Sequence, residues 1–363
     1  MTDRERTPVV RLAPAKLNLT LAVLGVRSDG FHALHSVMVP LGLADRLSLA
    51  RAAGGEDSLH VVLAVGAVAA PASAVGAHLA PSSADPAAFD SVLLGIAEAR
   101  RVVGGGAETF PLAARLEKRI PIAAGLAGGS SDAAAAIDGA FEAWGADPSP
   151  DDRRRAAAAV GSDVPFFLAG APALVEGRGE RVTALRSVSG EPPGVLLVTP
   201  AAPISTQAAF AAFHADLAAA PANAGSTRLT SEHLAAEMGP GHPAMKSHDL
   251  LLRAGVLAVA NDLANAADAL LPGLRRLRRA LTRLLGVPIG LSGSGPTLWA
   301  LYPALAGAEE AAVQVREQVR LGLLDSPGDG PPFVTATTIA AGSDSAATGP
   351  TDAATANPPG REP

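Results

Sequence analysis

The chain has 363 residues, a formal net charge of −6 and no cysteine. This length is sufficient for two domains with a sizeable core. The absence of cysteine excludes disulfides, thiolate nucleophiles and Cys-ligated metal centres, and the charge balance gives no support for nucleic acid or a membrane surface as a partner. The N-terminus lacks the apolar core of a signal peptide, and no apolar run reaches the ~18 residues of a membrane span. We therefore expect a cytoplasmic protein.

The first part of the chain has the pattern of strands. Residues 9–50 are expected to be mainly strands, with Leu17 and Leu19 alternating with Asn18 and Thr20 and with an Asp-Gly turn in residues 27–32. Residues 64–88 are rich in Ala, Pro, Ser and Gly and are expected to form an exposed connection. A helix over residues 91–101 and a strand over residues 110–116 follow.

The most informative segment is PIAAGLAGGSSDAA, residues 121–134. A glycine-rich turn that opens a helix presents free backbone N–H groups at the positive end of the helix dipole, which suits a phosphate group. The preceding strand and the Ser and Asp residues at the expected cap positions of the following helix favour this interpretation over a flexible surface turn. The segment has neither the Lys of a Walker A loop nor the spacing of a dinucleotide fingerprint, which argues against a dinucleotide-dependent oxidoreductase.

The remaining elements suggest a second domain. Residues 151–160 are expected to form a helix that ends at Gly161, residues 173–184 two short strands, and the Pro and Gly of residues 191–194 a domain boundary. Strands over 195–199 and 333–339, a strand–turn–strand unit over 288–302, and helices over 274–284 and 309–321 follow, whereas residues 218–247 carry little pattern. The arginines of the 274–284 helix are interpreted as a solvated face. We predict domains at 1–190 and 191–340, with a disordered tail at 341–363.

Three further segments carry residues suited to chemistry, and each also has a purely structural interpretation. Lys16 and Asn18 share one face of a strand and suit a phosphate or polyol, although a solvated strand face is the simpler explanation. Asp163, between a helix-ending glycine and an apolar run, is either a helix cap or a general base. The SGSGPT segment, residues 292–297, allows close approach of the backbone to a ligand but by itself is a turn.

Taken together, the order PAKLNL, DGFH, PIAAGLAGGSSDAA, GSDVPFF, SGSGPT resembles the GHMP kinase superfamily, from about Val10 to Ile339. The glycine loop and GSGP are common to the superfamily. PAKLNL, DGFH, GSDVPFF and EGRGE are more specific, and they match the branch whose members phosphorylate the C2 hydroxyl of a methylerythritol linked to cytidine diphosphate. The resemblance implies an α+β, two-domain GHMP kinase fold, with an N-terminal domain containing a left-handed βαβ unit and a C-terminal ferredoxin-like domain.

The resemblance also assigns expected roles to residues. Lys16 and Asp163 match the catalytic positions, and Asn18, Phe31, His32, Gly293, Ser294 and Gly295 match positions that bind the substrate. ATP is expected over the loop formed by Pro121, Ile122, Ala123, Ala124, Gly125, Leu126, Ala127, Gly128, Gly129, Ser130 and Ser131. The family usually has Tyr where this chain has Phe31, and a phenyl ring can still stack on a base. Ala123, Ala124 and Ala127 stand where some relatives have Gly, and a methyl group is tolerated well only at negative φ.

The expected reaction is phosphoryl transfer from ATP with Mg²⁺, which depends mainly on positioning and charge stabilisation. Asp163 is expected to accept or orient the hydroxyl proton, and Lys16 to pair with Asp163 and stabilise the developing charge. Ser130 and Ser131 are both candidates for contact with the metal. The alternatives are another small-alcohol kinase of the superfamily, for homoserine or a sugar, and a non-catalytic nucleotide-binding relative. The presence of both Lys16 and Asp163 argues against the latter, and the expected assembly is a monomer or homodimer.

Overall fold

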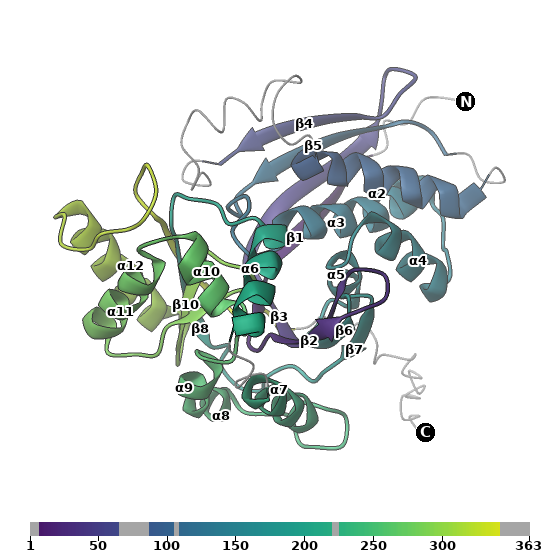
Figure 1. Cartoon of the computed structure of the whole chain (residues 1–363). Helices are drawn as coiled ribbons and strands as arrows, with labels where there is room; N and C mark the ends of the chain where they lie inside the picture. Colours follow the sequence, from purple (N-terminus) through teal and green to yellow (C-terminus); the bar gives the residue numbers. More distant parts are fainter. Residues whose placement is uncertain (1–6, 65–86, 105–108, 220–224, 342–363) are drawn as a thin grey trace, which may run out of the picture.

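A computed structural model describes residues 7–64, 87–104, 109–219 and 225–341, and within them the chain forms two β-sheets with helices packed around them (Figure 1). The strands of the first sheet are β1 Val9–Asn18, β2 Ala22–Val26, β3 His32–Arg51, β4 Ser58–Leu63, β5 Leu112–Lys118, β6 Ala173–Gly177 and β7 Arg181–Ala184. Those of the second are β8 Gly194–Thr199, β9 Gly290–Leu291, β10 Leu298–Tyr302 and β11 Phe333–Thr338. The helices are α2 Ala87–Val103, α3 Gly128–Trp144, α4 Pro150–Val160, α5 Val164–Ala169, α6 Thr206–Ala219, α7 Ser226–Glu237, α8 Ser247–Leu252, α9 Ala254–Leu257, α10 Ala264–Leu270, α11 Leu274–Leu285 and α12 Leu305–Arg320.

The first sheet is organised around the long strand β3, which pairs antiparallel with β1, β2, β5 and β6. The strand expected over residues 45–50 is the end of β3, and the expected Asp-Gly turn connects β2 to β3. β4 runs parallel to β5, and the chain passes through α2 between them. This parallel pair with a helical crossover is the βαβ unit that the family resemblance implies.

The second sheet has the strand order β11-β8-β10-β9 and is antiparallel throughout. Counted along this half of the chain, the order is fourth, first, third, second, with α12 as the crossover between β10 and β11. This is the arrangement of a ferredoxin-like domain, as expected. Figure 1 shows α10, α11 and α12 beside this sheet, and α2, α3 and α4 beside the first one.

Helix α3 is the central element of the N-terminal half. It packs against α2, α4, α5, β1 and β3, and its alanines allow these close approaches because they add little volume. The helix begins at Gly128, and its N-cap is Ala127 in a left-handed conformation. The expectation that Ser or Asp would cap it was wrong, because Ser130, Ser131 and Asp132 already lie inside the helix.

One of the buried hydrophobic clusters is shared by the two sheets, and each sheet also has a cluster of its own. The shared cluster contains Leu17 and Leu41 from the first sheet and Leu197 and Trp299 from the second. The backbone of Leu41 also pairs with that of Ile339, just beyond β11. The domain division at residue 190 therefore stays a prediction. The predicted exposed connection and disordered tail lie almost wholly outside the described residues.

The largest difference from the expected secondary structure is in the second half. The stretch 218–247 contains α7, and α6, α8, α9 and α10 were not predicted. These segments are short or rich in alanine, and alanine is accommodated on a buried and on an exposed helix face alike. The periodic contrast between apolar and polar residues, on which a helix prediction depends, is therefore weak there.

Candidate active site

The end of β1 places Lys16 and Asn18 inside the protein. Each is only 3% exposed, so the interpretation as a solvated strand face was wrong, although Leu17 is buried on the opposite face as expected. The Nζ of Lys16 donates hydrogen bonds to Oδ1 of Asn18 at 2.5 Å and to the carbonyl oxygen of Gly125 at 2.6 Å. The amide nitrogen of Asn18 donates to Oγ of Ser36 at 2.8 Å. Burial lowers the pKa of Lys16, and the negative charge of Asp163 partly opposes this shift.

The glycine loop lies against the predicted turn of residues 292–297. Gly125 has a φ of +75°, and a Cβ atom there would lie 2.3 Å from the carbonyl oxygen of Ser292. The hydroxyl of Ser292 donates to the carbonyl oxygen of Gly125 at 3.0 Å. The backbone N–H of Thr297 donates to the carbonyl oxygen of Ala124 at 3.4 Å. Two segments that are distant in sequence thus form one wall of the site.

The alanines of the loop differ in conformation. Ala123 and Ala127 have φ values of 53° and 54°, which lie in the left-handed region, whereas the φ of Ala124 does not lie there. Ala124 thus satisfies the preference of a methyl-bearing residue for negative φ, whereas Ala123 and Ala127 stand at positions that favour glycine. An L-residue in this region is disfavoured by about 1–2 kcal/mol, so the loop holds two strained positions.

Asp163 lies between α4 and α5, at the N-cap position of α5. Its side chain makes no capping hydrogen bond to the helix, so the carboxylate is not used as a cap. The predicted direct pair with Lys16 is not formed, because the Lys16 ammonium bonds to Asn18 and to the glycine loop instead, while Asp163 acts on Lys16 through its electrostatic field.

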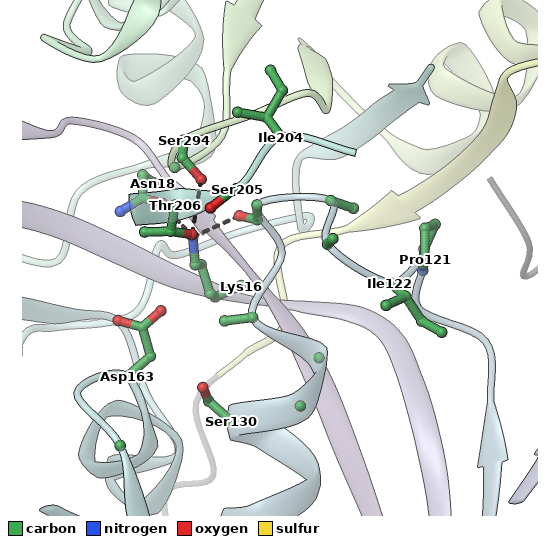
Figure 2. A pocket seen from close by; sticks show the side chains of 18 of the residues that line it. Lys16, Asn18, Pro121, Ile122, Ser130, Asp163, Ile204, Ser205, Thr206 and Ser294 are labelled. Carbon is green, nitrogen blue, oxygen red and sulfur yellow. Dashed lines mark hydrogen bonds between the residues drawn. The ribbon is translucent and has the colours of Figure 1, made fainter. Parts of the chain in front are cut away.

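One cavity of about 840 Å³ brings most of the predicted residues together. Figure 2 shows Lys16, Asp163 and Ser130 around the same open space. The predicted site residues that line it are Lys16, Asn18, Pro121, Ile122, Ala123, Ala124, Gly125, Ala127, Gly128, Gly129, Ser130, Asp163, Gly293 and Ser294. Leu126, Ser131 and Gly295 do not line it, and Leu126 and Ser131 are buried behind its wall.

Phe31 and His32 also lie outside this lining. Phe31 is 48% exposed, with the guanidinium of Arg178 5.2 Å from its ring centroid. His32 stacks on Phe210, whose ring centroid is 4.3 Å away, and its Nε2 contacts Nε2 of His214 on α6. Phe210 lines the cavity, so His32 is one aromatic ring removed from it. Burial and the proximity of His214 lower the pKa of His32.

Several lining residues were not predicted. They are Leu21, Leu34, Met38, Ser91, Lys118, Ala133, Val160, Gly161, Val164, Pro203, Ile204, Ser205, Thr206, Phe210 and Leu263. Thr206, at the start of α6, is 3.2 Å from Ser294 between the hydroxyl oxygens, which connects α6 to the 292–297 turn. Phe210 was missed because α6 was missed.

Lys118 was also not predicted, although the sequence carries a signal for it. It ends β5 on the same face as the buried Leu112, Ala114 and Leu116, so the alternating pattern indicates a buried lysine. A buried ammonium needs carboxylate partners, and Lys118 contacts both Asp45 and Asp132, the latter at 2.7 Å. Burial opposes the charge of Lys118, but these two carboxylates raise its pKa above the usual value.

Among the described residues, no group of three or more His, Cys, Asp and Glu side chains is arranged to bind a metal ion. In the same part of the chain, no helix combines the length and hydropathy required to span a membrane.

Comparisons with known proteins agree with this architecture. The family model described as GHMP kinases N terminal domain matches residues 92–171. A protein of Synechococcus sp. (strain CC9605), named 4-diphosphocytidyl-2-C-methyl-D-erythritol kinase, is 37% identical over 86% of this chain and 93% of its own length. A protein of the same name from Pelotomaculum thermopropionicum is 34% identical over 85% of this chain and 94% of its own length.

Solved structures show the same fold. A crystal structure of 4-(cytidine 5'-diphospho)-2C-methyl-D-erythritol kinase is similar with a TM-score of 0.58 and 26% identity, over 91% of this chain and 99% of that one. A homoserine kinase from Cytophaga hutchinsonii has a TM-score of 0.62 at 15% identity, over 93% and 96% of the two chains. At that identity the second likeness concerns the fold alone.

Proposed function

The chain belongs to the 4-diphosphocytidyl-2-C-methyl-D-erythritol kinase family, and from this premise we propose that it transfers the γ-phosphoryl group of ATP to the C2 hydroxyl of 4-diphosphocytidyl-2-C-methyl-D-erythritol. The product would be the 2-phosphate, an intermediate on the non-mevalonate route to isopentenyl diphosphate. We place this reaction in the cytoplasm.

One observation carries the proposal. Lys16, Asp163 and the first residues of α3 line one cavity, although they come from β1, from the residue before α5 and from the glycine loop. A carboxylate, a buried ammonium and free helix N–H groups are the three elements that phosphoryl transfer to an alcohol requires. A module that only binds a nucleotide needs neither the carboxylate nor the buried lysine.

The residues divide the work as follows. The N–H groups of Gly128, Gly129 and Ser130 would hold the phosphates of ATP. Asp163 would orient the substrate hydroxyl and take its proton as the oxygen attacks phosphorus, because its carboxylate is not engaged in capping. Lys16 would stabilise the negative charge that develops between the attacking oxygen and the γ-phosphoryl group. The bonds of Lys16 to Asn18 and Gly125 fix its ammonium in place before substrate arrives.

Mg²⁺ suits this donor set. It prefers phosphate oxygens and water with only one or two protein ligands, so the lack of an acidic cluster in the described chain is compatible with it. When bound, the ion neutralises charge on the phosphates. Of the two candidate hydroxyls, that of Ser130 lines the cavity, whereas Ser131 is 1% exposed and does not. We therefore propose Ser130 as the side chain that would contact the metal.

The test is an assay of the purified protein with ATP, Mg²⁺ and 4-diphosphocytidyl-2-C-methyl-D-erythritol. We expect release of ADP and a product heavier by one phosphoryl group, with the new phosphate placed on C2 by ³¹P–¹³C coupling. Homoserine and a set of sugars serve as parallel acceptors, because the fold is shared with homoserine kinase. Turnover of homoserine or a sugar without turnover of the diphosphocytidyl substrate would refute the proposal.

A further inference from the structure

A chain of hydrogen bonds leads from the ammonium of Lys16 into the interior of the protein. Lys16 donates to Oδ1 of Asn18 at 2.5 Å, and the amide nitrogen of Asn18 donates to Oγ of Ser36 at 2.8 Å. The hydroxyl of Ser36 donates in turn to the carbonyl oxygen of Thr20 at 2.5 Å. These four residues are all at most 3% exposed, so bulk water does not replace a partner that is lost here. The proposed reaction gives Ser36 no role.

The carbonyl oxygen of Thr20 fixes the direction of every bond in this chain. A carbonyl oxygen only accepts, so the hydroxyl hydrogen of Ser36 is used at Thr20. Ser36 can therefore only accept from Asn18, whose side-chain amide must turn its NH₂ group toward the hydroxyl. The amide oxygen then faces the ammonium of Lys16, which can only donate. The opposite orientation of the amide would place its NH₂ group against the ammonium.

The far end of the chain is anchored on the backbone of β3. Thr20 follows the end of β1, and its Oγ1 accepts from the backbone N–H of Val37 at 3.0 Å. The carbonyl oxygen of Val37 accepts from the backbone N–H of Leu19 at 2.9 Å. Ser36 itself lies within β3. The orientation of the Asn18 amide is thus set by two paired strands and not by a mobile side chain.

The orientation of the amide matters because of how many donors Lys16 has. An ammonium has three N–H donors, and those of Lys16 bond to Oδ1 of Asn18, to the carbonyl oxygen of Gly125 and, with the third, to whatever occupies the cavity that Lys16 lines. The three N–H bonds are arranged tetrahedrally. Once two of them have fixed acceptors, the direction of the third is also fixed.

We propose that Ser36 is a positioning residue that orients the amide of Asn18 and thereby aims the third N–H of Lys16 at the phosphoryl group in transfer. Without the hydroxyl of Ser36, the NH₂ group of Asn18 is buried without an acceptor, and the amide has no reason to keep its oxygen toward Lys16. The inference rests on the proposed function, because it assigns Ser36 a part in that reaction.

Ser36→Ala is tested by steady-state kinetics and by equilibrium binding of ATP. We expect kcat to fall about tenfold, as for the loss of one partner in a buried hydrogen-bond network. The dissociation constant of ATP should stay within about twofold of the wild-type value, because the phosphates are assigned to the glycine loop. Ser36→Thr keeps the hydroxyl and should recover most of the lost kcat.

Ser231→Ala, on α7, is the matched control. Ser231 is 0% exposed, as Ser36 is, and its hydroxyl contacts the hydroxyl of Thr20 at 2.7 Å and Nδ1 of His35 at 2.8 Å. The substitution removes a buried hydroxyl beside the same chain but leaves the bond between Asn18 and Ser36 in place. It should lower stability and leave kcat unchanged. An equal loss of kcat in Ser36→Ala and Ser231→Ala would overturn the inference.

A double-mutant cycle distinguishes an effect through Asn18 from a general disturbance of β3. In the background of Asn18→Ala, Ser36 has no amide to orient, so Ser36→Ala should lower kcat by less than about twofold more. Equal losses in the two backgrounds would show that Ser36 does not act through Asn18. Ser36→Cys replaces Ser36→Ala throughout if the latter does not fold, because a thiol fills the space but is a weak acceptor.

A measurement without substrate separates this inference from the proposed function. The solvent exchange of the Asn18 side-chain amide is followed by ¹⁵N NMR, with its signal assigned by its loss in Asn18→Ala. Exchange should be slow in the wild type and in Ser231→Ala, and fast in Ser36→Ala. Fast exchange in the wild type, or slow exchange in Ser36→Ala, would overturn the inference. The expected exchange pattern in a protein that does not phosphorylate the diphosphocytidyl substrate would overturn only the proposed function.

Discussion

Nζ of Lys16 lies 2.6 Å from the carbonyl oxygen of Gly125, so the buried ammonium on β1 and the glycine loop before α3 hold each other in position. The same carbonyl oxygen accepts from Ser292, which joins the second half of the chain to this contact. The proposed catalytic cation, the proposed phosphate loop and the 292–297 turn therefore form one connected unit.

Replacement of Lys16 by methionine tests the role of the ammonium. The variant keeps most of the apolar stem and loses the charge, so we expect kcat to fall by about 10²–10³-fold, as for the loss of one donor that stabilises a transition state. Steady-state kinetics with both substrates provide the measurement. Lys246→Met, at an exposed position, is the matched control and should retain full activity. A kcat within a few-fold of the wild type would remove Lys16 from the mechanism.

Asp163→Asn tests the general base. The amide is nearly the same size as the carboxylate but cannot take a proton, so kcat should fall by about 10²–10⁴-fold. The dissociation constant of ATP should change little, because the phosphates are assigned to backbone N–H groups of the loop. Rapid-quench turnover and equilibrium ATP binding separate the two effects. A variant that turns over normally would show that Asp163 is not the base.

Gly125→Ala tests the contact between the loop and the 292–297 turn. The new methyl group would collide with the carbonyl oxygen of Ser292 and would also be strained at a φ of +75°. Gly145→Ala is the matched control, since Gly145 has a φ of +65° and nothing within 4 Å of the added Cβ. Both variants should lose about 1 kcal/mol or more of stability from backbone strain. Only Gly125→Ala should weaken ATP binding, by about tenfold or more, and equal affinities in the two variants would contradict the assigned contact.

Ala127→Gly should stabilise the protein. The strain energy relieved at Ala127 is larger than the entropic cost of ordering a glycine on folding. The net gain in the free energy of unfolding should be about 0.5–1 kcal/mol. Ala124→Gly should do the opposite, because Ala124 is 2% exposed and has no such strain to relieve. Urea unfolding of the two variants gives the comparison, and a loss of stability in both would be inconsistent with the loop conformation described above.

Asp132→Asn should change how stability depends on pH. The folded protein raises the pKa of Asp132 to about 7, whereas an unfolded aspartate titrates near pH ~3.9. Between these values the folded state binds more protons, so this group makes the wild type less stable as pH rises. The melting temperature of the variant relative to the wild type should therefore increase from about pH 5 to about pH 8. Thermal unfolding monitored by circular dichroism measures it, and a difference that is constant with pH would argue against a protonated Asp132.

Much of the site was predictable from sequence because its backbone parts have local signatures. The glycine loop, the strand that carries Lys16 and the segment around Asp163 are each defined within a few residues. The resemblance of their order to a known family then indicated that they meet. The strand order of the second sheet and the βαβ unit of the first agree with that resemblance.

The other features of the fold and of the site could not be predicted, because they depend on contacts between segments that are distant in sequence. The N-cap of α3 was misassigned because Ala127 adopts a conformation that its residue type disfavours, and only tertiary packing imposes it. Phe210 belongs to an alanine-rich helix with little periodicity. The pairing of Lys118 with Asp45 and Asp132 joins residues separated by as many as 73 positions, and no local pattern specifies the partners.

The shared core also bears on how the protein is made. Lys16 is synthesised early, whereas Gly293 and Ile339 are synthesised much later. A Cβ atom added to Gly293 would lie 3.0 Å from Nζ of Lys16, and the backbone of Ile339 pairs with that of Leu41 in β3. A ribosome-bound nascent chain that stops before these segments leaves the apolar residues around Leu17 and Leu41 without their partners. Nucleotide binding should therefore appear only once the segment through Ile339 has emerged from the ribosome, and until then the apolar residues around Leu17 and Leu41 are open to association with a chaperone.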